Sequence, residues 1–168
     1  MLETPEELGR LQALLDRSID RAGPRLRSII DDERRLTAEE VAQKMRGMCL
    51  LVLATVTADG RPLAGPVDGY LIHGNVYFSS GRDSVRMRHL AKRAHCSASW
   101  LPGEDTAVTV HGRAELFDVM DPSRPELKQA MLDHYLPKQG PGFQKWLEGA
   151  DAIGARIEAD RMFTFHTG

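Results

Sequence analysis

Long apolar runs are absent from this chain of 168 residues. The most aliphatic stretch, residues 48–57 (MCLLVLATVT), is far shorter than the roughly 20 residues that a membrane-spanning helix needs. The N-terminal segment MLETPEELGRLQALLDRSID is acidic and patterned as a helix, which excludes a secretory signal peptide. We therefore expect no association with a membrane.

Cysteine is also scarce in this chain. Its two cysteines, Cys49 and Cys96, are too few and too far apart to form a disulfide framework. Both occur in apolar stretches, which predicts buried free thiols and a cytoplasmic location.

Neither an excess of charge nor a familiar catalytic motif is present. The 22 Lys and Arg against 24 Asp and Glu give a net charge of −2, which excludes general nucleic-acid binding. The six histidines show no HExxH or comparable spacing, so we expect no metal site. Nucleophile-elbow, Walker A and Gly-x-Gly-x-x-Gly patterns are missing as well, and no side chain stands out as a catalytic acid or base.

What is present first is a helical N-terminus. Two capping boxes, Thr4-Pro5-Glu6-Glu7 and Thr37-Ala38-Glu39-Glu40, each open a segment with apolar residues at helical spacing. We predict that residues 1–47 form a helical extension. The pattern does not decide between packing on the rest of the chain and packing on a partner chain.

Residues 48–168 change to a period of two and predict a second region, a β-barrel domain. Asp59-Gly60 and Gly74-Asn75 predict tight turns, so the first three strands form an antiparallel meander. A helix is predicted to follow the third strand, and further helical segments to begin near Asp121 and around Phe143. The six predicted strands are 48–57 (a buried strand), 61–72, 76–79, 96–101, 106–117 and 155–166. Six strands favour a closed or nearly closed barrel, because an open sheet leaves exposed edges.

A cluster of basic residues marks a candidate binding site. Ser79-Ser80-Gly81-Arg82-Asp83-Ser84-Val85-Arg86-Met87-Arg88 joins the end of a strand to the start of a helix. A helix start favours an anion, and its first turn disfavours cations by roughly 0.3–1 kcal/mol each. Bound phosphate reverses that penalty by accepting hydrogen bonds from arginine and from backbone N–H groups. The alternative is a solvated surface whose arginines pair with carboxylates.

A longer segment resembles a known family. LATVTADGRPLAGPVDGYLIHGNVYFSSGRDSVRMRHLAKRAHCSASW, followed by AVTVHGRAELF, is similar to the pyridoxamine 5′-phosphate oxidase-like superfamily, which includes F420-dependent reductases. The resemblance covers about residues 48–118 and implies a six-stranded antiparallel split β-barrel of the FMN-binding type with added helices. It also implies a homodimer with two cofactor sites at the subunit interface.

The same resemblance assigns expected roles to individual residues. Arg86 and Arg88 match the basic positions that bind the cofactor phosphate. Three serines match the hydroxyl-bearing positions of the phosphate loop, and one strand segment matches the stretch that runs beside the ring system. The serines are Ser79, Ser80 and Ser84, and the strand residues are Pro66, Val67 and Asp68. Trp100 ends a strand and has two interpretations: it covers a flavin ring from the partner subunit, or it packs in the core.

One departure from the family pattern concerns the substrate. Vitamin B6 oxidases resemble each other in a C-terminal Arg-x-His element, whereas here Arg161 is followed by Met162 and Phe163. This argues against oxidation of pyridoxamine phosphate. The leading hypothesis is an FMN-dependent or F420-dependent oxidoreductase of a small-molecule substrate, with FMN preferred as the commoner ligand of the superfamily.

Two alternatives to that enzyme remain open. One is a non-enzymatic protein that binds a flavin, F420 or haem, the last through His89, His111 or His166. The other is a structural dimer that has lost the site.

Overall fold

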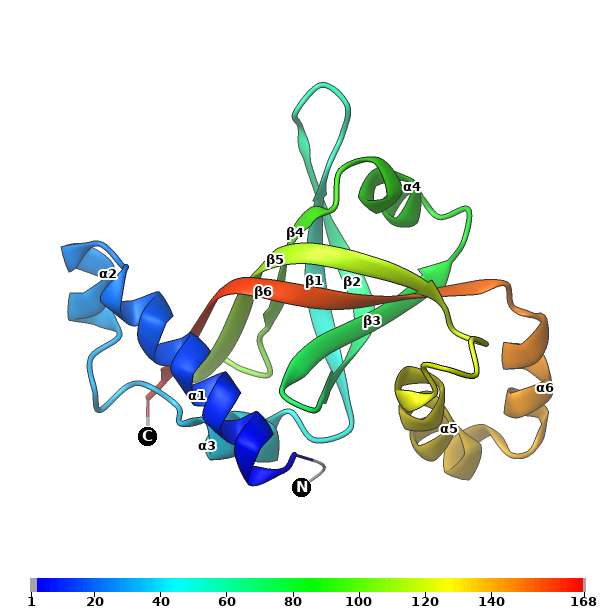
Figure 1. The fold of residues 1–168 in the computed structure, drawn as a ribbon, viewed down its shortest axis with the longest axis horizontal. Helices are drawn as coiled ribbons and strands as arrows, with labels where there is room; N and C mark the ends of the chain where they lie inside the picture. The colour runs from blue at the N-terminus through cyan, green and yellow to red at the C-terminus, as the bar shows by residue number, and fades with distance from the viewer. Residues whose placement is uncertain (1–2, 168) are drawn as a thin grey trace.

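Six antiparallel strands close into a barrel in the computed structural model, which describes residues 3–167 (Figure 1). Met1, Leu2 and Gly168, which the two predicted regions include, lie outside the described residues. The order around the barrel is β1-β2-β3-β6-β5-β4, which confirms the predicted fold class. The strands are β1 (Met48–Val56), β2 (Pro62–Ile72), β3 (Asn75–Gly81), β4 (His95–Trp100), β5 (Thr106–Asp118) and β6 (Ala152–His166).

The first strand shows how the sequence makes a barrel wall. Side chains alternate across a strand, so Cys49, Leu51 and Leu53 point into the main core, whereas Leu50 and Val52 point outward and are exposed. The prediction of a buried strand is therefore correct for one face only. Cys49 is free and buried, as predicted, and burial raises the pKa of its thiol to about 11.

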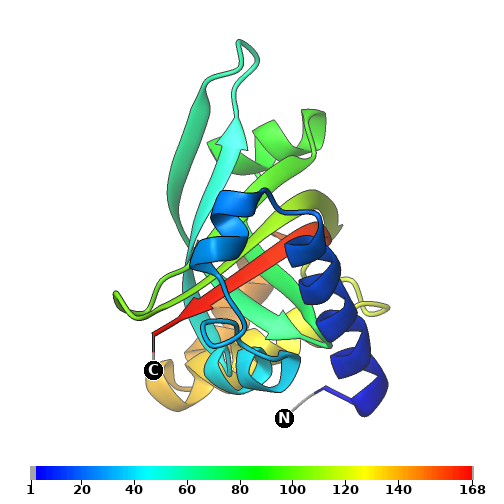
Figure 2. The same cartoon turned by 90° about the vertical axis from the view of Figure 1, so that its left-hand side faces the viewer.

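The turns also follow from local chemistry. The β1–β2 hairpin projects beyond the barrel (Figures 1 and 2), and Gly60 at its tip has a φ of 84°. The next turn has positive φ at His73 (52°) and Gly74 (73°), which is the pattern of a type I′ turn. Its centre lies one residue before the predicted Gly74-Asn75, because the histidine adopts the left-handed conformation that usually favours glycine or asparagine.

The N-terminal helices are α1 (Pro5–Asp20), α2 (Pro24–Ile29) and α3 (Ala38–Lys44), and both predicted capping boxes are formed. The helices α1 and α3 pack on the barrel, which answers the question that the sequence left open. Leu11, Leu15 and Val41 are buried in the same cluster as the barrel interior. The short helix α2 had no counterpart among the predicted elements.

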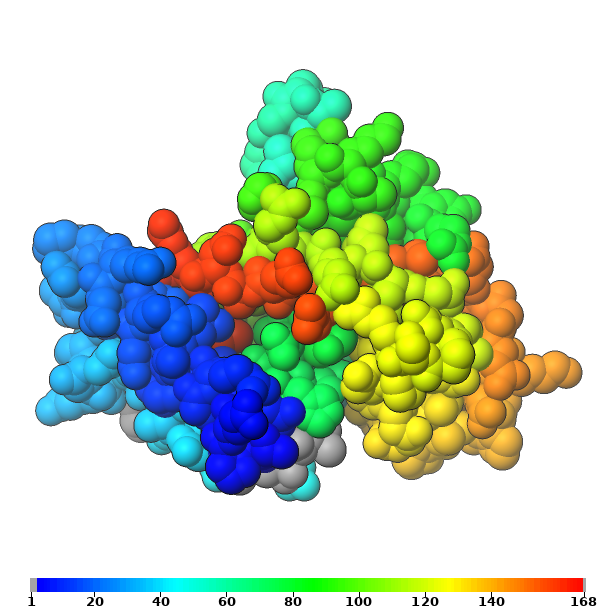
Figure 3. Space-filling view, viewed as in Figure 1, coloured from blue at the N-terminus to red at the C-terminus, as the bar shows by residue number. Residues whose placement is uncertain are grey.

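Three further helices follow along the chain: α4 (Val85–Lys92), α5 (Glu126–Gln139) and α6 (Gly142–Gly149). In Figure 1, α4 lies near the β1–β2 hairpin, whereas α5 and α6 lie together at the end of the barrel away from the N-terminal helices. The helices α5 and α6 cover the outer face of β2 and β3, where Tyr70, Tyr77 and Phe143 belong to a second hydrophobic cluster. In Figure 3 the α5–α6 pair (yellow to orange) and the N-terminal helices (blue) lie at opposite ends of the molecule. Within residues 3–167, no helix is long and apolar enough to span a membrane.

Candidate functional site

The candidate site begins where β2 and β3 separate. The last paired residues of these two strands are Gly69 and Phe78. Because the strands are antiparallel, Asp68 and Ser79 come immediately beyond that pair on the same side. From there β3 continues along β6, with Ser79 opposite Gly154. The barrel wall is therefore split at this point, next to the loop that leads into α4.

Helix α4 begins just after this split. Ser84 has extended backbone angles, and its hydroxyl oxygen accepts a hydrogen bond from the Met87 N–H at 3.3 Å, so Ser84 is the N-cap. The hydroxyl hydrogen of Ser84 is still able to donate to a bound group. Ser84 therefore caps the N-terminus of α4 and keeps a hydroxyl donor there.

The structure separates the three arginines of the basic cluster. Arg82 donates to Asp151 at 2.7 Å and to Asp118 at 2.9 Å, so its charge is compensated by two carboxylates. These bonds tie the end of β3 to the end of β5 and to the start of β6. For Arg82 the structure thus bears out the alternative of an arginine paired with carboxylates.

The other two arginines are bonded to main-chain oxygens only. Arg86 Nη1 donates to the carbonyl oxygen of Pro66 at 2.7 Å, and Arg88 Nη1 donates to that of Asp83 at 2.8 Å. Among residues 3–167, neither arginine forms an ion pair with a carboxylate. A guanidinium has five N–H donors, so both retain donors and an uncompensated positive charge.

Arg86 lies directly against the strand segment that is expected to border a ring. A Cβ atom at Gly65 would lie 3.4 Å from Arg86 Nη2, which is ordinary contact distance. Val67 is buried in the barrel core, so this residue presents only its main chain on the outer side. Arg86 therefore connects the helix start with Gly65 and Pro66 of β2.

A cavity of about 480 Å³ lies between the split in the barrel wall and the helices α5 and α6. Three of the residues expected in the site line this cavity: Asp68, Ser79 and Ser80. The full lining comes from β2, β3, α5, α6, the residue that follows α6 and the first residue of β6. It consists of Asp68, Ser79, Ser80, Gly81, Met131, Tyr135, Gln139, Phe143, Trp146, Leu147, Ala150 and Ala152.

The polar centre of the cavity is a hydrogen bond between Tyr135 and Asp68. The Tyr135 hydroxyl donates to Asp68 Oδ2. Burial, together with this bond to the carboxylate, raises the pKa of Tyr135 to about 12, so the hydroxyl keeps its proton at neutral pH. The hydroxyl of Tyr70 is buried with no hydrogen-bond partner among the described residues, and its pKa is raised by burial and by the nearby Tyr135 and Asp68.

Aromatic side chains form the helical wall of the cavity. The ring centroids of Tyr135 and Phe143 lie 4.8 Å apart, and those of Phe143 and Trp146 lie 5.4 Å apart. Trp146 is 61% exposed, which is unusual for so large an apolar side chain. The sequence patterns placed these residues in predicted helical segments and did not identify them as site residues. Their concentration between positions 135 and 146, in a chain with only 6% aromatic residues, was the available signal.

Trp100 lies elsewhere in the barrel. It ends β4 opposite Leu51 and Val108, is half-buried, and packs against the main core. It does not line the cavity of its own chain. Its contact with a ring bound to the partner subunit stays a prediction.

The histidines considered as haem ligands are engaged within the barrel. Nδ1 of His89 lies 3.0 Å from the Thr55 hydroxyl, and Nδ1 of His111 lies 2.7 Å from that of Ser97. His166 makes a similar contact with Thr106 at 3.0 Å. None of the three lines the cavity, and the described residues contain no group of three or more His, Cys, Asp or Glu placed to hold a metal ion.

Several solved structures share the fold of this chain. A conserved hypothetical protein from Mycobacterium tuberculosis superposes with a TM-score of 0.66 at 19% identity, over 81% of this chain and 88% of that one. HutZ, the haem storage protein from Vibrio cholerae, gives 0.57 at 17% identity, over 77% and 92%. A protein named F420 reductase gives 0.55 at 18% identity, over 72% and 94%. At these identities the likeness concerns the fold alone.

Sequence comparison gives the assignment itself. No curated protein sequence matches this chain significantly. The family model described as pyridoxamine 5′-phosphate oxidase matches residues 37–161, which is most of the chain and includes every residue of the candidate site. The chain therefore belongs to the pyridoxamine 5′-phosphate oxidase family.

Proposed function

We propose that this protein is an FMN-dependent oxidoreductase that acts as a homodimer on a small-molecule substrate, with F420 as the alternative cofactor. The observation that carries the proposal is the pair Arg86 and Arg88 beside the split between β2 and β3, since no carboxylate among residues 3–167 forms an ion pair with either side chain. When bound, such a cofactor supplies the hydride or electron chemistry, while the protein anchors, orients and shields it.

The residues around the helix start fit the phosphate of such a cofactor. Two guanidinium groups and the hydroxyl of Ser84 are donors at the N-terminus of α4, where the helix dipole also favours an anion. Charge-assisted hydrogen bonds of this kind are about twice as strong as neutral ones. In this proposal Arg86, Arg88 and Ser84 hold the phosphate. Ser79 and Ser80 line the neighbouring cavity, so the phosphate role that the family resemblance gives them stays a prediction.

The strand residues fit the ring system. Pro66, Val67 and Asp68 lie between Arg86 and the cavity, so a ring attached to a phosphate at α4 runs along their backbone. The Arg86 bond to the Pro66 carbonyl holds the anchoring side chain against the same strand. No described side chain needs to act as a catalytic base in this arrangement.

Haem fits these residues less well than a flavin does. A haem protein of this kind needs an axial side-chain ligand, and the histidines with that potential are bonded to Thr55, Ser97 and Thr106 away from the cavity. The absorbance spectrum of the purified protein separates the three cofactors, since a Soret band identifies haem, and flavin and F420 absorb differently from each other. Mass spectrometry of the copurified molecule then identifies it directly.

A second copy of the chain is the proposed partner. Leu50 and Val52 on the outer face of β1 are 59% and 44% exposed, and in the strand register they lie opposite Asp68 and Pro66. A second chain on this face would bury them and border the site. Val52→Asp is expected to give monomers by size-exclusion chromatography with light scattering, whereas Ile29→Asp, at another exposed apolar residue, leaves a dimer. A monomeric wild-type protein would contradict this part of the proposal.

The cofactor site itself is tested by binding. Arg86→Ala is expected to raise the dissociation constant for FMN severalfold or more, because a charged hydrogen-bond donor to the phosphate is lost. Lys92→Ala removes one positive charge from the last turn of the same helix and serves as the control, with affinity unchanged. Equal FMN affinities of the wild type and Arg86→Ala would show that Arg86 does not bind the cofactor phosphate.

A further inference from the structure

We infer that the cavity between the split wall and α5–α6 binds a planar aromatic substrate that is uncharged or cationic, and that it rejects anionic compounds. That the bound compound is a substrate depends on the proposed function, but its charge class depends only on the cavity. The volume of about 480 Å³ is typical of small-molecule sites.

The charge preference follows from the residues that line the cavity. Asp68 is the only charged side chain among them, and Arg86 and Arg88 belong to the helix start outside the lining. Tyr135 donates to Asp68 Oδ2, and Oδ1 accepts no hydrogen bond from the described residues. Oδ1 is therefore available to a donor on the ligand. A carboxylate in a partly buried cavity repels a second negative charge.

The shape preference follows from the opposite wall. Tyr135, Phe143 and Trp146 form a row of neighbouring rings on α5 and α6, with Trp146 extending to the surface. Aromatic side chains favour stacking or edge contacts with another flat ring. On the facing wall, Gly81 and Ala152 lack bulky side chains, which leaves room for a flat molecule. The ligand is thus expected to lie between the barrel wall and the aromatic row.

The charge of the cavity lining differs from that expected for the substrate site of a vitamin B6 phosphate oxidase. A substrate phosphate needs cationic side chains around it, whereas this lining has none and contains a carboxylate. The absence of the C-terminal Arg-x-His element, where Arg161 is followed by Met162 and Phe163, removes the same kind of partner.

Three compounds that share a naphthalene ring and carry a neutral, a cationic or an anionic substituent provide the test. They are naphthalene-2-carboxamide, 2-naphthylmethylammonium and 2-naphthoate, titrated into the full-length protein as purified. The readout is the indole N–H resonance of Trp146, assigned with Trp146→Phe and compared with that of Trp100. We expect saturable shifts of the Trp146 signal with the amide and the cation, and at least about tenfold weaker binding of the naphthoate.

The role of Asp68 is tested by removing its charge. Asp68→Asn keeps the shape and is expected to bring the three affinities within about threefold of one another. Asp133→Asn removes the same charge from the exposed side of α5, where the Gln129 side-chain amide donates to the Asp133 carboxylate, and should leave the discrimination intact. Any of three results would overturn the inference. They are naphthoate binding as tightly as the amide, no binding of any of the three compounds, and unchanged discrimination in Asp68→Asn.

The outcomes also distinguish this inference from the proposed function. If FMN affinity depends on Arg86 but the Trp146 signal shows no discrimination by charge, the inference about the cavity is wrong and the cofactor site is supported. If the cavity discriminates by charge but the protein binds no cofactor, the ligand site is supported and the proposed oxidoreductase function is ruled out.

Discussion

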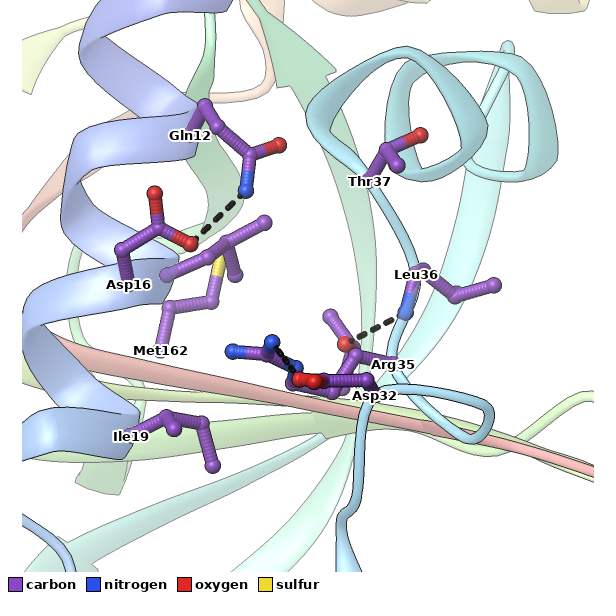
Figure 4. A pocket seen from close by; sticks show the side chains of 10 residues that line it. Gln12, Asp16, Ile19, Asp32, Arg35, Leu36, Thr37 and Met162 are labelled. Carbon is purple, nitrogen blue, oxygen red and sulfur yellow. Dashed lines mark hydrogen bonds and ion pairs between the residues drawn. The ribbon is translucent and has the colours of Figure 1, made fainter.

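The barrel carries helices at both ends, and the two ends differ in how completely they are packed. At the N-terminal end, Leu11 and Leu15 of α1 extend the core of the barrel itself, with 2% and 5% exposure. The space left between α1 and the segment before α3 is only about 110 Å³ (Figure 4). At the other end, α5 and α6 leave about 480 Å³ and the largely exposed Trp146.

Polar groups follow the same division. Under α1, the Ser18 hydroxyl donates to the Leu14 carbonyl and accepts from the Met162 N–H, and the Leu36 N–H donates to Thr164, so buried polar atoms are satisfied. Under α5, the hydroxyl of Tyr70 has no partner in the described chain. The comparison indicates that the N-terminal helices complete the core, whereas α5 and α6 pack less closely and leave the cavity for which we propose a binding role.

The largest expected effect is at the N-terminal end. Leu15→Ala should lower the free energy of unfolding by about 2–5 kcal/mol, because it opens a cavity in a closely packed core. Trp146→Ala, a larger truncation at the other end, should cost less than about 1 kcal/mol, since the side chain is mostly exposed. Urea denaturation monitored by circular dichroism measures both. Similar losses of unfolding free energy in the two variants would contradict the difference in packing between the two ends.

The next effect tests the polar groups under α1. Ser18→Ala leaves the buried Met162 N–H without an acceptor and should cost about 1–3 kcal/mol. Ser28→Ala removes an exposed hydroxyl that bonds only to the Arg25 carbonyl, and its stability should match the wild type in the same denaturation experiment. A neutral Ser18→Ala would mean that water replaces the lost bond.

A pH-dependent effect sharpens the comparison at α5. The pKa of Tyr135 is raised from 10.0 to about 12, so between these values the folded protein keeps a proton that the unfolded chain releases. The stabilisation that Tyr135 contributes is therefore complete below pH 10.0 and is lost as the pH rises towards about 12. Tyr135→Phe should show a shallower loss of urea midpoint over this interval. Identical slopes would show that Asp68 and burial do not hold that proton.

The smallest expected effect concerns the unpartnered hydroxyl. Tyr70→Phe removes a buried polar atom without a partner and should leave stability unchanged or raise it by up to about 1 kcal/mol. Thermal unfolding compares this variant with Tyr77→Phe, which lies in the same hydrophobic cluster. A clear loss of stability in Tyr70→Phe would show that the hydroxyl has a partner after all.

The sequence by itself determined the features that depend on neighbouring residues. The capping boxes at Thr4 and Thr37 form because each acceptor and donor lie three residues apart, and a period of two defines each strand. The pairing of Arg82 with Asp118 and Asp151 was decided by tertiary structure, because these partners are 36 and 69 positions away along the chain.

Tertiary structure also decided the cavity. Its central bond joins Tyr135 to Asp68, 67 positions apart, and forms only because α5 folds back over the split between β2 and β3. Local patterns specify which residues form a helix and which face of it is apolar, but not the distance at which that face stops short of the barrel wall. The volume left there depends on how side chains from β2, β3, α5, α6 and the start of β6 fill the space, and that is a property of the packed chain.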